Sequence, residues 1–135
     1  MISRSQIRVR YAETDTMGVV YHSNFLIYFE IGRTDYFREL GFTYKELEEK
    51  NIFMPVTECF CRFIAPAKYD DQLEVVTHFS VISRLKYKFT YEVFRLTDEK
   101  LLVDGYTHHV PVNSSGNPCR VPQNYRDALI GSIER

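Results

Sequence analysis

One long helix, apolar on nearly every side, constrains the fold of this chain more than any other feature. The segment from Asn24 to Leu40 contains no proline, and Gly41 follows where a left-handed residue commonly ends a helix. The helical period is carried by Phe25, Phe29, Gly32, Tyr36 and Leu40. The other sides of the first two turns are apolar as well, with Leu26, Ile27, Tyr28 and Ile31. We therefore expect this helix to be covered on most sides, and not to lie on a surface.

A loop with two carboxylates leads directly into the N-terminus of that helix. It holds Glu13 and Asp15, and it follows a segment in which Ile7, Val9 and Tyr11 alternate with arginines. Alternation of this kind predicts a half-buried strand. An acidic loop between a strand and a buried helix is the geometry that most suggests a functional site.

The rest of the chain predicts a short helix, a run of strands and a last helix. Thr43 and Glu46 have the spacing of a capping box, which predicts a short helix that stops at Asn51. The apolar period then changes to two, which predicts strands over 53–64, 72–82, 85–96 and 101–112. Short connections between the later strands make them antiparallel neighbours. A last short helix is expected over 122–130, opened by its proline.

Helices grouped early and strands grouped late indicate one α+β domain over 1–135, with the helix packed on one face of an antiparallel sheet. Because a flat sheet gives this helix too little cover, we expect the sheet to curl around it. A chain of 135 residues can bury about two-thirds of its unfolded surface in a single core.

Composition argues against several classes of protein. The formal net charge of −1 gives no basis for binding nucleic acid or a membrane surface. The residues after Met1 form no apolar run and include Ser, Arg and Gln, so we expect neither a signal peptide nor a transmembrane segment. The three cysteines predict free thiols in a reducing cytoplasm. Two of them, Cys59 and Cys61, are expected to pack as small buried hydrophobes, and no ligand set has zinc spacing, so we expect no metal.

Three motifs point to a known family. They are D-T-x-G-V-V-Y-H-x-N-F at Asp15–Phe25, E-x-x-R at Glu30–Arg33 and A-P-A-K-Y-D-D-Q-L at Ala65–Leu73. Together they resemble the hotdog-fold acyl-CoA thioesterases of the 4-hydroxybenzoyl-CoA thioesterase type, and most of all their YbgC-like branch. The resemblance covers about 7–112 and implies a curled sheet around one central helix. It also implies hydrolysis of an acyl-CoA to a free acid and CoA, without a metal or an organic cofactor.

The resemblance assigns roles within the acidic loop. In the family the loop aspartate is the catalytic carboxylate, and Asp15 matches it, either as general base on water or as nucleophile. His22 matches the position whose backbone N–H stabilises the oxyanion at the positive end of the helix. Its imidazole is a candidate second polar group at the reacting carbonyl, although other members carry Tyr there. Gly18 would let the backbone pass close to the thioester, and Tyr21 is expected to contact the substrate.

Each of these assignments has a structural alternative. Asp15 could be a turn residue that bonds its own backbone, and His22 a capping side chain. Glu13 is more simply a salt-bridged or loop-shaping residue. Glu30 and Arg33 stand three apart on the helix, so we interpret them first as an ion pair.

Arg84 and Lys86 are candidates for binding the phosphates of CoA, because they form a basic group near the start of a strand. The alternative is a solvated strand face whose lysines guard an exposed edge of the sheet.

The sequence therefore predicts a cytoplasmic acyl-CoA thioesterase. The alternatives are a thioesterase for acyl groups on acyl carrier protein and a non-catalytic acyl-CoA-binding module, and the presence of Asp15 argues against the latter. A small curled sheet has two open edges and encloses little volume. We therefore expect a homodimer, or a homotetramer of paired dimers, joined through an edge strand and the loop before the helix.

Overall fold

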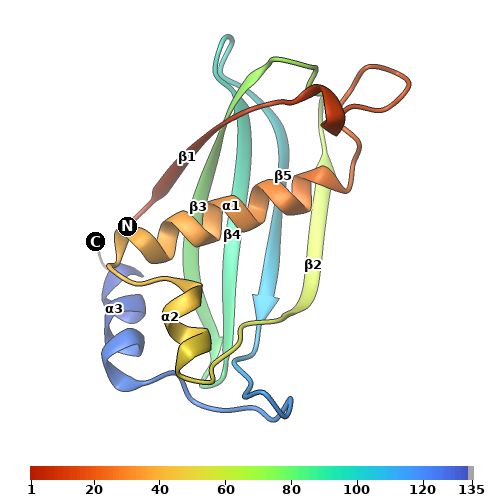
Figure 1. Ribbon diagram of the computed structural model, residues 1–135. Helices are drawn as coiled ribbons and strands as arrows, with labels where there is room; N and C mark the ends of the chain where they lie inside the picture. Colours follow the sequence, from red (N-terminus) through yellow and green to blue (C-terminus); the bar gives the residue numbers. More distant parts are fainter. Residues whose placement is uncertain (134–135) are drawn as a thin grey trace.

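A long helix crosses one face of a five-stranded antiparallel sheet in the computed structural model, which describes residues 1–133 (Figure 1). The sheet has the order β1-β3-β4-β5-β2. Its strands are β1 (Ser3–Arg8), β2 (Val56–Phe63), β3 (Gln72–Ser83), β4 (Lys86–Arg95) and β5 (Lys100–His109). The helices are η1 (Tyr11–Glu13), α1 (Asn24–Glu39), α2 (Tyr44–Glu49) and α3 (Gln123–Ile133). The predicted α+β hotdog architecture is confirmed, and the sheet stays open along both edges.

The central helix α1 forms where the period predicts it, and it ends at Leu40 and Gly41, whose φ is +93°. Its inner face is buried as expected, at Phe25, Tyr28, Phe29, Gly32, Tyr36 and Phe37. The expectation that the helix is covered on most sides is wrong for the single chain. Leu26, Ile27 and Ile31 are exposed, because no element within residues 1–133 packs over that side.

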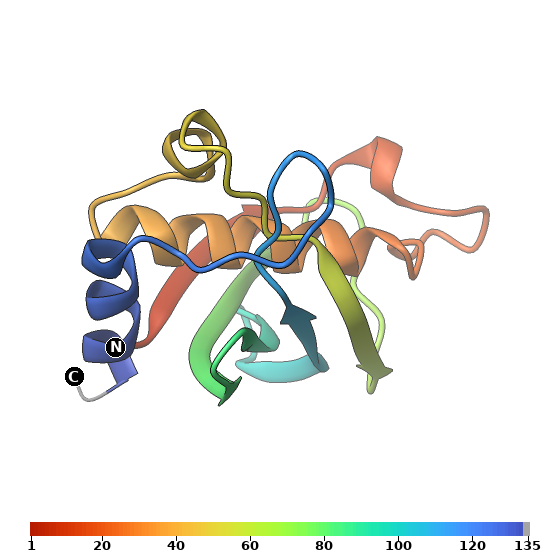
Figure 2. The same ribbon diagram turned by 90° about the horizontal axis from the view of Figure 1, so that it is seen from below.

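Aromatic side chains join α1 to the sheet. The ring of Phe29 stacks on Tyr91 of β4 with centroids 4.2 Å apart. The close approach depends on Gly32, since a Cβ there would lie 2.4 Å from the Thr77 hydroxyl of β3. On the side of α1 away from the sheet, α2 lies beside its C-terminal end (Figure 2), where the rings of Phe37 and Tyr44 pack edge to face.

The first strand lies earlier in the chain than predicted. Alternation of Ile7, Val9 and Tyr11 predicted a strand there, but β1 ends at Arg8 and the chain turns into η1. The buried positions within β1 include Ser3 and Ser5, so the pattern at its start is not apolar. Ser3 Oγ donates to Glu39 Oε1 (2.7 Å), so this buried hydroxyl has a hydrogen-bond partner.

The remaining elements follow their local signals. The Thr43 hydroxyl accepts the Glu46 N–H at 3.2 Å, which caps α2, and Asn51 stops it with a φ of 62°. The antiparallel pairing of β3 with β4 and of β4 with β5 is confirmed. Helix α3 follows Pro122 and packs near the β3–β4 hairpin. Within residues 1–133, no helix is long and apolar enough to cross a bilayer.

Candidate active site

The loop between η1 and α1 is a closed turn built on its own backbone. Asp15 N–H donates to Val19 O (2.8 Å), and Gly18 N–H donates back to Asp15 O (3.0 Å). Gly18 takes a φ of +79°, a conformation that favours glycine. A Cβ at Gly18 would meet no atom within 4 Å, so within one chain this glycine serves the turn and not a close approach.

The carboxylate of Asp15 is held by one oxygen and free at the other. Its Oδ1 accepts the N–H groups of Met17 (2.8 Å) and Val19 (3.4 Å), as a turn aspartate does. Within the described chain, Oδ2 has no hydrogen-bond partner. The turn interpretation of Asp15 is therefore correct, and it leaves one fixed carboxylate oxygen available to a water or a substrate.

Glu13 shapes the loop from inside. Its buried carboxylate accepts the N–H of Arg10 (2.8 Å) and the hydroxyl of Tyr28 (3.0 Å), and it pairs with the Arg10 guanidinium (3.4 Å). Burial and the nearby Glu13 charge raise the pKa of Tyr28. The loop-shaping role expected for Glu13 is confirmed by these contacts.

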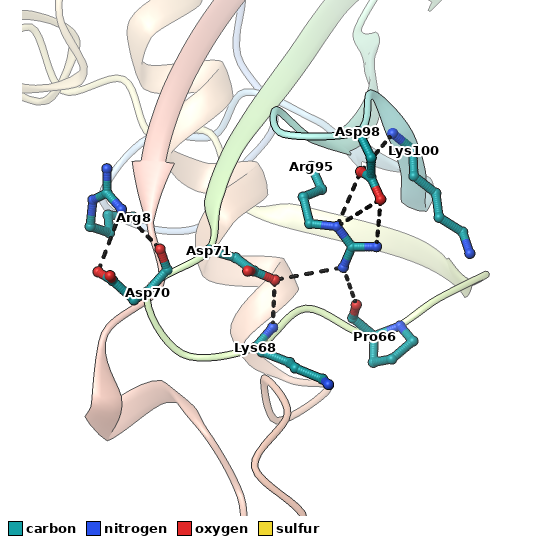
Figure 3. A network of polar contacts seen from close by, with 8 residues as sticks. All are labelled: Arg8, Pro66, Lys68, Asp70, Asp71, Arg95, Asp98 and Lys100. Atoms are coloured by element: carbon teal, nitrogen blue, oxygen red, sulfur yellow. Dashed lines mark hydrogen bonds and ion pairs between the residues drawn. The ribbon is translucent and has the colours of Figure 1, made fainter.

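A second loop, 64–71, braces the first one. Val20 N–H donates to Ala67 O at 2.9 Å, which ties the two loops together. The second loop is itself fixed by Arg95, which donates to Pro66 O (3.1 Å) and lies 3.6 Å from Asp71 (Figure 3). The A-P-A-K segment is thus a braced turn that supports the Asp15 loop from behind.

The N-terminus of α1 keeps free backbone donors. No side chain caps it, and turn hydrogen bonds occupy the N–H groups of Asn24, Phe25 and Leu26. In the part of the chain that the structure describes, the N–H groups of His22 and Ser23 have no acceptor. The His22 imidazole packs on Tyr21 (centroids 4.4 Å) and on the edge of Phe63 (6.2 Å), so it does not cap the helix.

An open hollow of about 730 Å³ brings Asp15 and Tyr21 together. Tyr11, Ala12, Thr14, Thr16 and Asn24 complete its lining. Gly18 and His22 lie beside the hollow in sequence but do not line it. Asn24 had not been considered as a site residue, because its role is fixed by a distant contact: its side-chain amide donates to Glu13 O at 2.9 Å.

Arg84 and Lys86 do not line a common hollow. Arg84 lines a hollow of about 260 Å³ between the β3–β4 hairpin and α3, together with two arginines that the sequence analysis missed, Arg120 and Arg126. Lys86 is absent from that lining and acts on Glu58, helping to lower its pKa after the larger effect of the Tyr106 hydrogen bond. Strand β4 is central, so its lysines guard no edge, and that part of the alternative interpretation is wrong.

Two expectations about side chains near α1 and β2 need correction. Arg33 forms no ion pair with Glu30 among the described residues, and the pair three apart that does form on α1 is Asp35–Arg38 (3.3 Å). Cys59 is exposed, because β2 is an edge strand open on both faces. Burial raises the pKa of the Cys61 thiol to about 11. No cluster of metal-binding side chains occurs within residues 1–133.

Comparison with known proteins places this architecture in a family. The model of the thioesterase-like superfamily matches residues 9–129. The acyl-CoA thioesterase YbgC of Haemophilus influenzae is 38% identical over 67% of this chain and 68% of its own length. The DHNA-CoA thioesterase structure from Staphylococcus aureus superposes with a TM-score of 0.92 at 32% identity, covering 96% of this chain and 89% of that one.

A hypothetical protein from Thermus thermophilus is similar at 36% identity, with a TM-score of 0.90 and 98% of each chain covered. The family match spans the braced loop, α1 and strands β2 to β5, and the two solved structures are covered over 89% and 98% of their length. The chain therefore belongs to the thioesterase-like superfamily, as a hotdog-fold acyl-CoA thioesterase of the YbgC-like kind.

Proposed function

We propose that this protein hydrolyses an acyl-CoA to the free acid and CoA, with Asp15 as its catalytic carboxylate. The observation that carries the proposal is the state of Asp15. One oxygen is fixed by two backbone N–H groups, the other has no hydrogen-bond partner among the described residues, and Asp15 lines a hollow at the start of α1.

The chemistry divides between the loop and the helix. Attack on the thioester carbonyl creates an oxyanion, which a fixed N–H group at the positive end of a helix stabilises. The unpaired N–H of His22 supports this role for its backbone. Asp15 acts either as general base on a water or as nucleophile through a mixed anhydride. Tyr21 lines the hollow and would contact the acyl group.

The CoA end is assigned to the arginine hollow. Arg84, Arg120 and Arg126 surround it, and no carboxylate contributes to its lining. The Arg126 guanidinium donates to Tyr87 Oη at 2.9 Å, which fixes its position. Phosphates of CoA carry the charge that such a group of arginines binds well.

The test of the proposal is Asp15→Asn. The amide oxygen of Asn can still accept the Met17 and Val19 N–H groups, so the loop should keep its shape. We expect kcat for acyl-CoA to fall by about a hundredfold or more, because the carboxylate acts in the transition state. His22→Ala should cost less, since its backbone N–H remains.

Steady-state kinetics on both variants, with melting temperature as the control for folding, checks this expectation. A well-folded Asp15→Asn protein of full activity rules the mechanism out. Turnover in heavy-oxygen water separates the two roles of Asp15. Only a mixed anhydride can carry label into its carboxylate, which mass spectrometry detects.

We also propose that the active form is at least a dimer joined along β2. The other edge, β1, is short and presents Arg4, Gln6 and Arg8 to solvent, a common protection of edge strands. Strand β2 is open on both faces, and Val56 (45%) and Phe63 (52%) remain exposed. The uncovered side chains of α1 extend this apolar surface, and apolar patches of this kind mark interfaces.

A further inference from the structure

Arg33 is a half-buried cation without a counter-charge. None of the ion pairs formed within residues 1–133 includes it. Glu30, one turn earlier on α1, is exposed. A charge withdrawn from water is costly unless an opposite charge accompanies it, so an unpaired arginine in such a place calls for an explanation.

A directed chain of hydrogen bonds ends beside this arginine. His109 Nδ1 lies 3.2 Å from Met54 O, which can only accept, so Nδ1 carries the proton. Nε2 therefore accepts from the Thr107 hydroxyl (2.8 Å). Thr107 Oγ1 in turn accepts from Tyr91 Oη (2.7 Å). This series of hydrogen bonds uses the hydroxyl proton of Tyr91, so the lone pairs of the Tyr91 oxygen can accept from another donor.

The guanidinium of Arg33 lies near that oxygen. Burial lowers the pKa of Arg33, and the neighbouring hydroxyls of Tyr91 and Tyr44 raise it by more, so the side chain stays charged. The Tyr44 hydroxyl is buried and has no hydrogen-bond partner within the described chain. Two tyrosine hydroxyls thus lie near a guanidinium that has five N–H donors in a planar fork.

Arg33 also lines a hollow of about 260 Å³ between α1 and β2. The lining is largely apolar, from Leu26, Ile27 and Val56, and Cys59, Thr107 and Glu30 complete it. Glu30 forms no ion pair with Arg33 among the described residues. A largely apolar hollow with an unpaired cation in its lining suits an elongated ligand with an anionic tip.

In the proposed dimer this hollow faces the active loop of the other copy. A two-fold axis that pairs the β2 edges antiparallel sets the Phe63 end of one copy against the Val56 end of the other. His22 packs on Phe63, and Val56 lines the hollow. The oxyanion donor of one copy therefore lies at the mouth of the hollow of its partner.

We propose that Arg33 of one copy binds a carboxylate at the far end of the acyl group whose thioester is cleaved at Asp15 of the other copy. The preferred substrates are then CoA monothioesters of dicarboxylic acids. This inference rests on the proposed acyl-CoA hydrolysis. The carboxylate supplies the missing counter-charge and matches the guanidinium fork with two parallel hydrogen bonds.

The test compares substrates of equal length with and without the second carboxylate: succinyl-CoA with butyryl-CoA, and sebacyl-CoA with decanoyl-CoA. In at least one pair we expect kcat/KM to favour the dicarboxylic substrate by about tenfold or more. Arg33→Gln should remove that ratio, because a variant that merely folds poorly loses activity on both members of a pair. Arg33→Lys should keep part of the ratio, because it keeps the charge and loses the fork.

Glu30→Gln is the matched control on the same helix. This variant should keep the kcat/KM preference for the dicarboxylic substrate. If that preference is lost as it is in Arg33→Gln, Glu30 is the counter-charge of Arg33 and the inference is overturned. Equal rates within both pairs for the unaltered protein also overturn it. The inference is also overturned if the only effect of Arg33→Gln is dissociation into monomers, because the counter-charge of Arg33 would then be a side chain of the partner.

A binding measurement separates this inference from the proposed function. In the Asp15→Asn protein, free sebacate should raise the melting temperature more than decanoate does, and Arg33→Gln should abolish the difference. Failure of the unaltered protein to hydrolyse any CoA ester refutes the proposed function alone. Equal melting shifts from the two acids refute the role of Arg33.

Discussion

At the scale of single residues, hydrogen-bond partners fix the position or the protonation state of the side chains near the site. Glu13 is held by Arg10 and Tyr28, and its carbonyl oxygen holds Asn24 and Tyr21. The Asp15 loop is therefore placed by a buried carboxylate next to it. His109 is a similar case on the far side of α1, where Met54 and Thr107 select its neutral tautomer.

Acid should destabilise the protein through His109. Its burial, followed by the nearby Arg33 charge, lowers its pKa from 6.5 to about 4 in the folded protein. Between these values the unfolded chain binds the proton and the folded one does not, so stability is full above pH 6.5 and falls as pH drops toward 4. The loss contributed by this one group is about 3 kcal/mol.

Urea unfolding at neutral pH and at pH near the lower end of that window measures the effect. His109→Gln keeps an acceptor and a donor in place but cannot titrate, so its free energy of unfolding should fall less with acid than that of the unaltered protein. Parallel losses in both proteins contradict this role of His109, since other groups would then carry the acid sensitivity.

At the scale of elements, the β3–β4 hairpin and α3 together form the arginine hollow, which neither element forms alone. Arg84 comes from the hairpin and Arg126 from α3, and the Arg126 guanidinium also donates to Arg84 O at 3.3 Å. Lys86, two residues further on at the start of β4, does not line the hollow to which Arg84 and Arg126 contribute. The hairpin therefore offers a matched pair of cations with different surroundings.

Arg84→Ala should raise KM for acyl-CoA by about tenfold with little change in kcat, because phosphate contacts far from the thioester bind substrate and transition state equally. Lys86→Ala should leave KM unchanged. N-acetylcysteamine thioesters lack the nucleotide, so neither variant should alter their kinetics. If Arg84→Ala lowers activity on both kinds of substrate, the substitution has damaged the fold. If KM for acyl-CoA is unchanged, Arg84 is a surface charge that does not bind the substrate.

The whole molecule, as one chain, has its two proposed half-sites at opposite ends. The Asp15 loop adjoins the Phe63 end of β2, and the hairpin with Arg84 lies toward the other end (Figure 1). Antiparallel pairing of two β2 strands inverts one copy relative to the other. The loop of each copy then lies at the hairpin end of its partner, which gives one CoA ester access to both half-sites.

Ile27→Asp should break such a dimer, and Ile2→Asp should not. The two isoleucines are equally exposed in the single chain, at 49% and 48%, but only Ile27 lies on the apolar side of α1 beside β2. Light scattering at micromolar concentration should give twice the chain mass, or four times it, for the unaltered protein and for Ile2→Asp. A mass of 16.0 kDa with full activity contradicts the dimer.

Mixed dimers give a second test of the same assembly. A dimer of one Asp15→Asn chain and one Arg84→Ala chain retains a single intact site if each site draws on both copies. Mixing the two variants should therefore restore activity at low substrate concentration to a level that neither reaches alone. Additive activity of the mixture shows that each chain is complete by itself.

The sequence by itself determined the elements and the loop that carries Asp15. A helical period without proline gives α1, a hydroxyl at the cap gives α2, and alternation gives β3, β4 and β5, because each of these signals acts between residues close in the chain. The Asp15 motif lies within one short segment, so its position before the helix was readable as well. Its assignment as the site depends on the family resemblance.

Only the tertiary structure decided which distant residues meet. Arg95 braces the loop at Pro66, and Arg126 joins Arg84, across separations that no local period records. The buried Ser3 and Ser5 shift β1, because the partner strand β3 and not the apolar pattern fixes its position. Arg33 faces two tyrosines in place of Glu30, since packing of α1 on β4 turns that side chain inward. Local forces fix the elements, and long-range packing fixes what each side chain faces.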